Sequence, residues 1–251
     1  MPDTLIRQYR LTELLGTGRH GETWLAIDEA LQRPVTLKFL PASLVTDSAW
    51  RERYLDARTR LNRLTHAQIT VFFALDTETD RPFLVREYAP GRSIAQDSDG
   101  QPLFYSDFLY IAAQAAAALT SAQSEEITLG NITPANIIVD DVRHIRLVDC
   151  CLPWPSPGKT VDSYELSDMR YRAPEQLEGG EVTPASDIFA LGLVFYELLT
   201  GVYPIEADTV ESYRERLTTE PLDFNSIASQ RIPTDAHLLL ESMCAIDPAE
   251  R

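Results

Sequence analysis

Hydrophobic and polar residues alternate along about the first 90 residues and then follow a helical spacing along most of the rest. Alternation with period two is typical of half-buried β-strands, and a spacing of three to four residues is typical of amphipathic helices. The alternating segments are 9–15, 23–28, 34–40, 71–76 and 82–87. The segment 48–64 has helical spacing instead, with an apolar face at Tyr54, Leu61 and Leu64. The pattern predicts a β-rich first region that contains one helix.

A turn-forming stretch at Tyr88-Ala89-Pro90-Gly91 is typical of a hinge, and helical patterns dominate beyond it. Helices are predicted over 105–122, 186–200, 209–218 and 235–245, and short apolar strands over 137–139 and 145–148. The loop after the second of these strands is about 25 residues long, a length that favours a functional or disordered segment. Its hydroxyl groups, from Ser156 to Ser167, are candidate phosphate acceptors or simply the polar residues of a loop.

Composition and charge narrow the class of protein. A hydrophobic content of 44% in 251 residues indicates a globular chain with a sizeable core. The net charge of −16 argues against nucleic acid as a partner and suits either a basic protein partner or a solvated acidic surface. Three cysteines without a disulfide or metal pattern favour a reducing, cytoplasmic setting. The longest apolar run, 188–199, is too short to span a membrane.

Two motifs in the β-rich region point to phosphate chemistry. Gly16, Gly18 and Gly21 form G-x-G-x-x-G between two predicted strands, where backbone N–H groups approach phosphates if the turn is more than a flexible hairpin. Lys38 is the last residue of Val35-Thr36-Leu37-Lys38, within the predicted strand 34–40. It is one of two lysines among 22 basic residues, so a chance lysine at a strand edge is the weaker interpretation.

The later region carries further motifs in a fixed order. Asn131 and Asn136 precede the strand 137–139, and Asp149 ends the strand that follows. Tyr171-Arg172-Ala173-Pro174-Glu175, Asp187–Gly192 and Asp247–Arg251 come later. Together with the glycine turn and Lys38, this set resembles the protein kinase superfamily, in its bacterial serine/threonine form, over residues 9–251.

The resemblance implies an α+β fold of two lobes, a small β-rich lobe over 9–88 and a larger helical lobe over 89–251. We expect the chain to be part of a longer polypeptide. The resemblance also assigns two sets of site residues. The nucleotide set is Gly16, Gly18, Gly21, Lys38, Arg86, Glu87 and Ala89, and the metal set is Asn136 and Asp149.

Several positions depart from the family pattern. Asn131 stands where the family has its catalytic aspartate, and Thr133 stands where it has a lysine. An amide cannot accept a proton as a carboxylate does, and a positioned base is typically worth about 10²–10⁴-fold in rate. Cys150-Cys151 replaces the Phe-Gly that follows the metal-binding aspartate. No intact catalytic residue remains at these positions.

Two departures lie on the nucleotide side. The glutamate that pairs with the family lysine is replaced by Ala57, and its neighbour Asp56 is rotated by about 100° around the helix. Arg86 stands at the back of the nucleotide pocket, where burial would require a partner such as Asp56 or Asp149 and where exposure to solvent is the alternative.

These departures predict a pseudokinase that is not an enzyme: a signalling or scaffolding module that binds protein partners. ATP is the candidate cofactor, with weak or no magnesium requirement, because fewer acidic groups remain around Lys38 and Asp149. Two alternatives stay open. One is a weak or unconventional ATP-dependent phosphoryl or nucleotidyl transferase, and the other is an interaction domain that needs no nucleotide.

Overall fold

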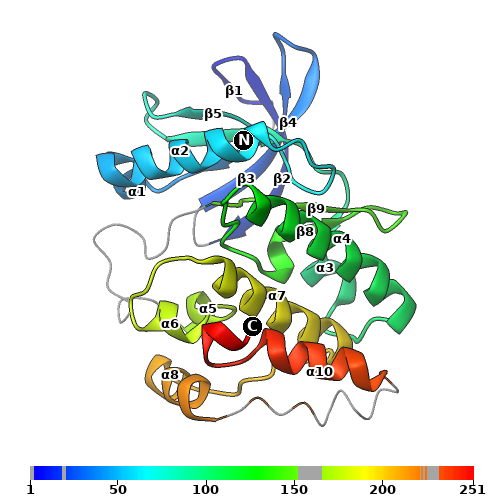
Figure 1. Ribbon diagram of the computed structural model, residues 1–251. Helices are drawn as coiled ribbons and strands as arrows, with labels where there is room; N and C mark the ends of the chain where they lie inside the picture. Colours follow the sequence, from blue (N-terminus) through cyan, green and yellow to red (C-terminus); the bar gives the residue numbers. More distant parts are fainter. Residues whose placement is uncertain (1–2, 19–20, 152–165, 221, 223, 225–231) are drawn as a thin grey trace. The chain divides into compact units, whose positions relative to one another are not determined.

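The computed structural model describes residues 3–18, 21–151, 166–220, 222, 224 and 232–251. They form two compact units, Met1–Pro90 and Gly91–Arg251 (Figure 1). Among these described residues, no helix has both the length and the apolar character needed to cross a bilayer. The predicted loop with Pro153, Pro155 and Pro157, and the candidate acceptors Ser156 to Tyr164, lie outside the described residues.

The first unit is built on a six-stranded antiparallel sheet in the order β1-β2-β3-β4-β6-β5. Its strands are β1 (Leu5–Ile6), β2 (Tyr9–Gly18), β3 (Gly21–Asp28), β4 (Arg33–Phe39), β5 (Phe72–Asp76) and β6 (Phe83–Glu87). All five predicted strands are present with small shifts at their ends. Strands β2 and β3 extend further than predicted, because the glycines of the turn continue the ladder and Gly18 pairs with Gly21.

The two faces of this sheet differ in character. One face carries a buried apolar cluster of Leu11, Trp24, Ala26, Val35, Leu37, Phe39, Phe83 and Val85. Side chains alternate between the faces of a strand, so the residues between these on β4 and β6 lie on the other face. Thr36 pairs directly with Arg86 there, and Lys38 pairs with Leu84. We call the side of β4 and β6 that carries Thr36, Lys38, Leu84 and Arg86 the polar face.

Helices α1 (Ala42–Thr46) and α2 (Ser48–Arg63) complete the first unit. The carboxylate of Asp47 caps α2 by accepting the N–H of Trp50 at 2.8 Å. The Tyr54 ring meets Phe72 of β5 edge to face, with 5.8 Å between centroids. Tyr54 and Leu61 are buried, which confirms these two positions of the predicted apolar face, whereas Leu64 follows the helix and is half-buried.

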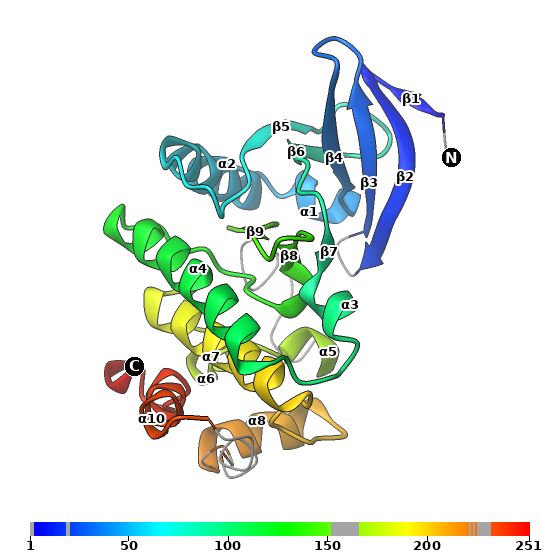
Figure 2. The same cartoon turned by 90° about the vertical axis from the view of Figure 1, so that its right-hand side faces the viewer.

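The second unit is largely helical and contains one small sheet. Its helices are α3 (Ile94–Ser98), α4 (Tyr105–Ser124), α5 (Leu166–Met169), α6 (Pro174–Leu177), α7 (Pro184–Thr200), α8 (Val210–Thr219) and α10 (Thr234–Met243), with 3₁₀ turns at Pro134–Asn136 and Pro248–Glu250. The sheet consists of β7 (Arg92–Ser93), β8 (Ile137–Val139) and β9 (Ile145–Leu147) in that order. Figures 1 and 2 show α4 and α10 packed alongside α7.

Helix α7 is the buried helix of the second unit, and residues at its two ends fix where it begins and stops. Thr183 caps it by accepting the N–H of Ser186 at 3.1 Å, and Pro184 occupies the first turn. Gly201 ends it in the left-handed conformation, with φ of 76°. Apolar residues lie on nearly all of its sides, which is typical of a helix buried in a core.

The end of the described chain is fixed to the second unit by a buried arginine. The Arg251 guanidinium donates to both carboxylate oxygens of Glu175, at 2.7 and 3.0 Å, and its side chain is fully buried. The same group lies over the Phe189 ring of α7, 4.7 Å from its centroid. This pairing confirms the one that the sequence motifs imply.

Replacing Arg251 by Met should lower the free energy of unfolding by about 3 kcal/mol or more, because it leaves a partly buried carboxylate without its partner. Chemical denaturation measures this value. Arg60→Met is the matched control, because the Arg60–Asp56 pair lies on the surface of α2 and should contribute less than about 1 kcal/mol. Equal losses in the two variants would contradict a special role for the buried pair.

Candidate active site

The loop between α4 and β8 is held by one buried carboxylate. Asp187 of α7 accepts the N–H of Leu129 at 2.6 Å and that of Gly130 at 2.8 Å, and only 1% of its surface is exposed. Burial raises the pKa of Asp187 to about 7, while these two N–H groups and the charge of Arg172 act to lower it. The carboxylate therefore anchors the loop at the residues directly before Asn131.

Asn131 is fixed by its side chain and by its main chain. Its Nδ2 donates to the carbonyl of Asp149 at 3.2 Å, and its own carbonyl accepts Nδ2 of Asn136 at 2.9 Å. Nη2 of Arg172 donates to Asn131 Oδ1 at 3.4 Å. The φ of 55° is left-handed, a region in which asparagine is several-fold enriched. Sequence reasoning did not assign Arg172 to the site, because nothing local to residue 172 points to the loop.

The two predicted metal ligands, Asn136 and Asp149, lie near each other in the second unit. The N–H of Val148 donates to the Asn136 carbonyl at 2.9 Å, which places Asn136 beside the residue before Asp149. The Asn136 amide uses Nδ2 on Asn131, which leaves Oδ1 as its acceptor. An amide oxygen and a carboxylate fit Mg²⁺, which takes a few protein oxygens and completes its shell with phosphate and water.

Acidic groups in the described part of the chain do not form a second candidate metal site. In the part of the chain that the structure describes, no group of three or more His, Cys, Asp or Glu residues is placed to hold a metal ion. A cation at Asn136 and Asp149 would therefore depend on oxygens from a phosphate ligand.

The two cysteines after Asp149, Cys150 and Cys151, are buried and form no disulfide with any described residue. The N–H of Cys151 donates to the Leu129 carbonyl at 2.5 Å, and its Sγ lies 3.5 Å from the Thr128 carbonyl. The burial of Cys150 and Cys151 agrees with the interpretation of this pair as small buried residues. Their backbone contacts tie the segment after Asp149 to the same loop that Asp187 holds.

The three glycines of the first unit differ in what the fold requires of them. A Cβ on Gly21 would lie 2.2 Å from the Phe39 carbonyl, and its φ is 104°, so the fold itself requires glycine there. Among the described residues, a Cβ on Gly16 or Gly18 would meet nothing within 4 Å beyond its chain neighbours. The fold gives no steric reason for glycine at these two positions, whereas the close approach of a ligand to the backbone would.

Arg86 is buried, with 5% of its surface exposed, so the alternative that it faces solvent is wrong. Its Nη1 donates to the Glu87 carbonyl at 3.3 Å. Asp56, one of the partners considered for it, is mostly exposed and pairs with Arg60 at 3.3 Å. The rotation of Asp56 away from the inner side of α2 is thus confirmed.

The other predicted residues of the nucleotide set lie near Arg86 along the chain or on the sheet. Glu87 ties β6 to the start of β5, since its N–H donates to the Val71 carbonyl at 2.8 Å and its carboxylate accepts the Val71 N–H at 3.2 Å. Ala89 is buried, and Lys38 lies on the polar face with 8% of its surface exposed.

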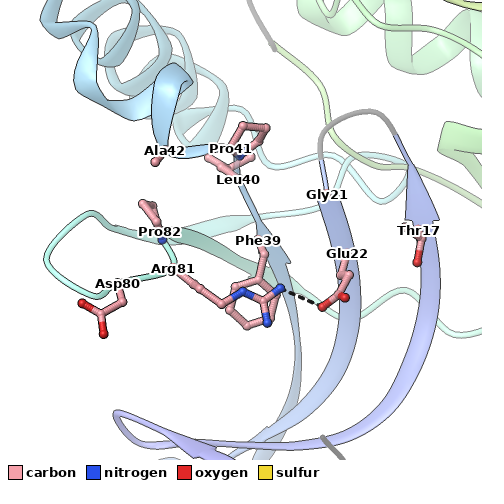
Figure 3. Close-up of a pocket in the computed structure, with 10 residues that line it drawn as sticks. All are labelled: Thr17, Gly21, Glu22, Phe39, Leu40, Pro41, Ala42, Asp80, Arg81 and Pro82. Carbon is pink, nitrogen blue, oxygen red and sulfur yellow. Dashed lines mark hydrogen bonds and ion pairs between the residues drawn. The ribbon is translucent and has the colours of Figure 1, made fainter.

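A separate pocket of about 300 Å³ lies in the first unit, beside the glycine turn (Figure 3). Its lining is Thr17, Gly21, Glu22, Phe39, Leu40, Pro41, Ala42, Asp80, Arg81 and Pro82. Arg81 lies over the Phe39 ring at 4.2 Å and pairs with Glu22 at 2.8 Å. Phe39 belongs to the apolar face of the sheet, so this pocket is distinct from the polar face that carries Lys38.

A glycine turn, a strand lysine, an anchored loop and an Asn–Asp oxygen pair are the parts of a protein-kinase-type phosphotransferase. The chain belongs to the protein kinase family, because the family model described as "Protein kinase domain" matches residues 9–251. The crystal structure of Rad53 1-466 in complex with AMP-PNP shares the fold at a TM-score of 0.78 and 19% identity, over 98% of this chain and 62% of that one. The predicted α+β two-lobed fold class is confirmed.

Curated relatives come from several bacteria. Serine/threonine-protein kinase PrkC of Bacillus subtilis is 30% identical over 82% of this chain and 32% of its own length. The DNA damage-responsive serine/threonine-protein kinase RqkA of Deinococcus radiodurans is 33% identical over 88% of this chain and 34% of its own length. The chain thus spans about a third of the length of these relatives.

The expectation that the chain is not an enzyme is wrong, because relatives that share 30–33% of its residues are serine/threonine-protein kinases. The expectation treated the missing base at Asn131 as decisive. In phosphoryl transfer, however, positioning and electrostatic stabilisation contribute separately from proton removal. Losing the base lowers the rate without removing the other contributions.

Asp187→Asn should change how stability depends on pH. A carboxyl with a pKa near 7 when folded, against about 4 when unfolded, stabilises the fold fully below pH 4 and loses this contribution as pH rises through 7. The unfolding free energy of the unchanged chain, relative to that of the variant, should therefore fall between about pH 4 and 7. Denaturant titrations at several pH values within that range measure it.

The matched control is Asp141→Asn, which removes one exposed carboxylate from the same unit. Its stability should follow that of the unchanged chain at every pH. A stability difference between the unchanged chain and Asp187→Asn that stays constant or rises with pH would contradict the raised pKa of Asp187.

Proposed function

We propose that this chain is a phosphotransferase domain of the serine/threonine protein kinase type that uses a nucleoside triphosphate, with ATP as the candidate donor, and transfers slowly because Asn131 occupies the position of the base. It acts in signalling on protein partners. The observation that carries this proposal is the hydrogen-bonded chain from Asp187 through Leu129 and Gly130 to Asn131, Asn136 and Asp149.

This network supports a retained transfer site. Asn131 holds the loop in place through Nδ2, a donor that an aspartate carboxylate does not have, and it lacks the carboxylate that accepts a proton. The bond from Asn136 Nδ2 to the Asn131 carbonyl fixes the two residues relative to each other. The arrangement preserves positioning, which supplies much of the catalysis in phosphoryl transfer.

The first unit supports nucleotide binding. Gly16 and Gly18 leave open space beside their backbone, and Lys38 supplies a positive charge on the polar face. Backbone N–H groups and a lysine are the usual partners of nucleotide phosphates in this family. The AMP-PNP named with the Rad53 structure supports the same ligand class. When bound, Mg²⁺ would neutralise phosphate charge, and Asn136 and Asp149 would hold it.

Asn131→Asp should raise the rate of phosphate transfer by about 10²–10⁴-fold, because it supplies a carboxylate where the amide now lies. Arg172 Nη2, 3.4 Å from Oδ1, would keep that carboxylate charged. The measurement is transfer of label to the chain itself and to a generic serine/threonine substrate. Labelled ATP and labelled GTP are supplied separately, because the identity of the donor is a further question.

The matched control is Asn131→Ala, which removes the amide without adding a base and should not raise the rate. Asp149→Asn should abolish transfer in the Asn131→Asp background. No transfer by either the unchanged chain or Asn131→Asp, with any donor, would contradict the proposal. Transfer of an α-phosphate label instead would indicate nucleotidyl transfer.

Gly16→Ala and Gly18→Ala should weaken nucleotide binding several-fold while leaving the thermal stability of the free protein nearly unchanged, since a Cβ at either position would have no described atom within 4 Å beyond its chain neighbours. Gly21→Ala should instead destabilise the free protein, because its Cβ would overlap the Phe39 carbonyl. Thermal melting with and without nucleotide separates the two effects. Unchanged nucleotide binding in both Gly16→Ala and Gly18→Ala would contradict a phosphate-binding turn.

A further inference from the structure

A buried hydroxyl on the polar face has no hydrogen-bond partner among the described residues. Thr36 is fully buried, and its Oγ1 has no hydrogen-bond partner among the residues that the structure describes. A buried polar group without a partner is unusual in proteins, because the lost hydration is not replaced. Such a group on a strand that also carries a candidate phosphate-binding lysine suggests that a ligand supplies the partner.

Strand register gives the position of this hydroxyl relative to the two cations. Thr36 lies directly opposite Arg86, and Lys38 lies two residues further along β4 on the same face. The spacing between Thr36 and Lys38 is roughly 7 Å along the strand. A nucleotide with its phosphates at Lys38 and the glycine turn therefore reaches Thr36 and Arg86 with the part of the molecule that carries the base.

The chemistry of these two side chains distinguishes one class of purine from another. The guanidinium of Arg86 presents only N–H donors, whereas the hydroxyl of Thr36 can donate or accept. Adenine directs an amino group, itself a donor, from its six-position, and guanine and hypoxanthine direct a carbonyl oxygen from the same position. The N–H donors of arginine hydrogen-bond to that carbonyl oxygen, but they cannot hydrogen-bond to the N–H donors of an amino group.

We propose that Arg86 and Thr36 make this site select nucleotides with a 6-oxopurine base, such as GTP or ITP, over ATP. This inference rests on the proposed function, because it concerns the nucleotide of the same site. Arg86 determines the selectivity through its donors. Thr36 adds affinity through a hydroxyl that the base satisfies.

Titration calorimetry of the purified chain with ATP, GTP and ITP tests the proposal. GTP and ITP should bind more tightly than ATP by about 5- to 150-fold, the discrimination typical of a good arginine–base pair. ITP is the informative ligand, because it has the six-position carbonyl without the two-amino group of guanine. Equal affinity for GTP and ITP supports the carbonyl as the recognised group.

Two variants separate the roles of the side chains. Arg86→Met removes the donors and should abolish the preference or reverse it in favour of ATP. Thr36→Val keeps the shape, so it should weaken GTP and ITP binding by about 2- to 10-fold without changing their order relative to ATP. It should also raise the melting temperature of the free protein, because it removes an unpaired buried hydroxyl. A purely structural Thr36 would raise the melting temperature and leave nucleotide affinity unchanged.

The unchanged chain alone decides the main point, so the test does not depend on Arg86→Met folding. ATP binding as tightly as GTP or more tightly would overturn the inference and leave the proposed function standing. Absence of binding by all three nucleotides would overturn both. A preference for GTP and ITP that persists in a folded Arg86→Met variant would overturn the role of Arg86.

Discussion

The carboxylate of Asp187 is the constraint on which the second unit's candidate site depends. Asp187 lies in the first turn of α7, is buried from solvent, and accepts two main-chain N–H groups of the loop, those of Leu129 and Gly130. Buried N–H groups need partners, and bonds to a carboxylate are among the stronger ones. Asn131, Asn136 and the segment after Asp149 are in turn bonded to this loop. The chain of contacts therefore runs from one buried acid to every candidate group of the unit.

The two faces of the sheet in the first unit differ in role: one packs into the apolar core, and the other carries the polar residues that we propose to bind a ligand. The apolar cluster on one face holds the strands together, so the opposite face is free to carry Thr36, Lys38 and Arg86. The same separation appears in the glycine turn. Gly21 is required by its contact with the Phe39 carbonyl, whereas Gly16 and Gly18 are not required by any contact within the fold. Gly16 and Gly18, which the described fold does not explain, are the glycines that we propose to meet a ligand.

Asn131 shows that the structural and chemical roles of one position can be separated. The amide keeps a bond to the Asp149 carbonyl and positions the main-chain oxygen that Asn136 contacts. What it lacks is the proton-accepting carboxylate. Membership of the protein kinase family, among relatives that are serine/threonine-protein kinases, corrects the inference from this single substitution to the absence of an enzyme. A loop that is held in place can still position reacting groups, which is one contribution to catalysis.

The sequence alone determined the longer strands and helices and the order of the motifs, whereas the short elements β1, α1, β7, α3, α5 and α6 were not predicted. Strand alternation, the apolar helix predicted over 186–200, and the spacing from the glycine turn to Asp149 are local properties, which a chain reveals before it folds. Only the tertiary structure decided that Arg86 is buried, that Arg172 contacts Asn131, and that the Thr36 hydroxyl has no partner within the described residues. Arg172 and Asn131 are 41 positions apart, and burial depends on every neighbour that folding brings together. Pairings of that kind leave no periodic signal in the chain, because they arise from packing in three dimensions.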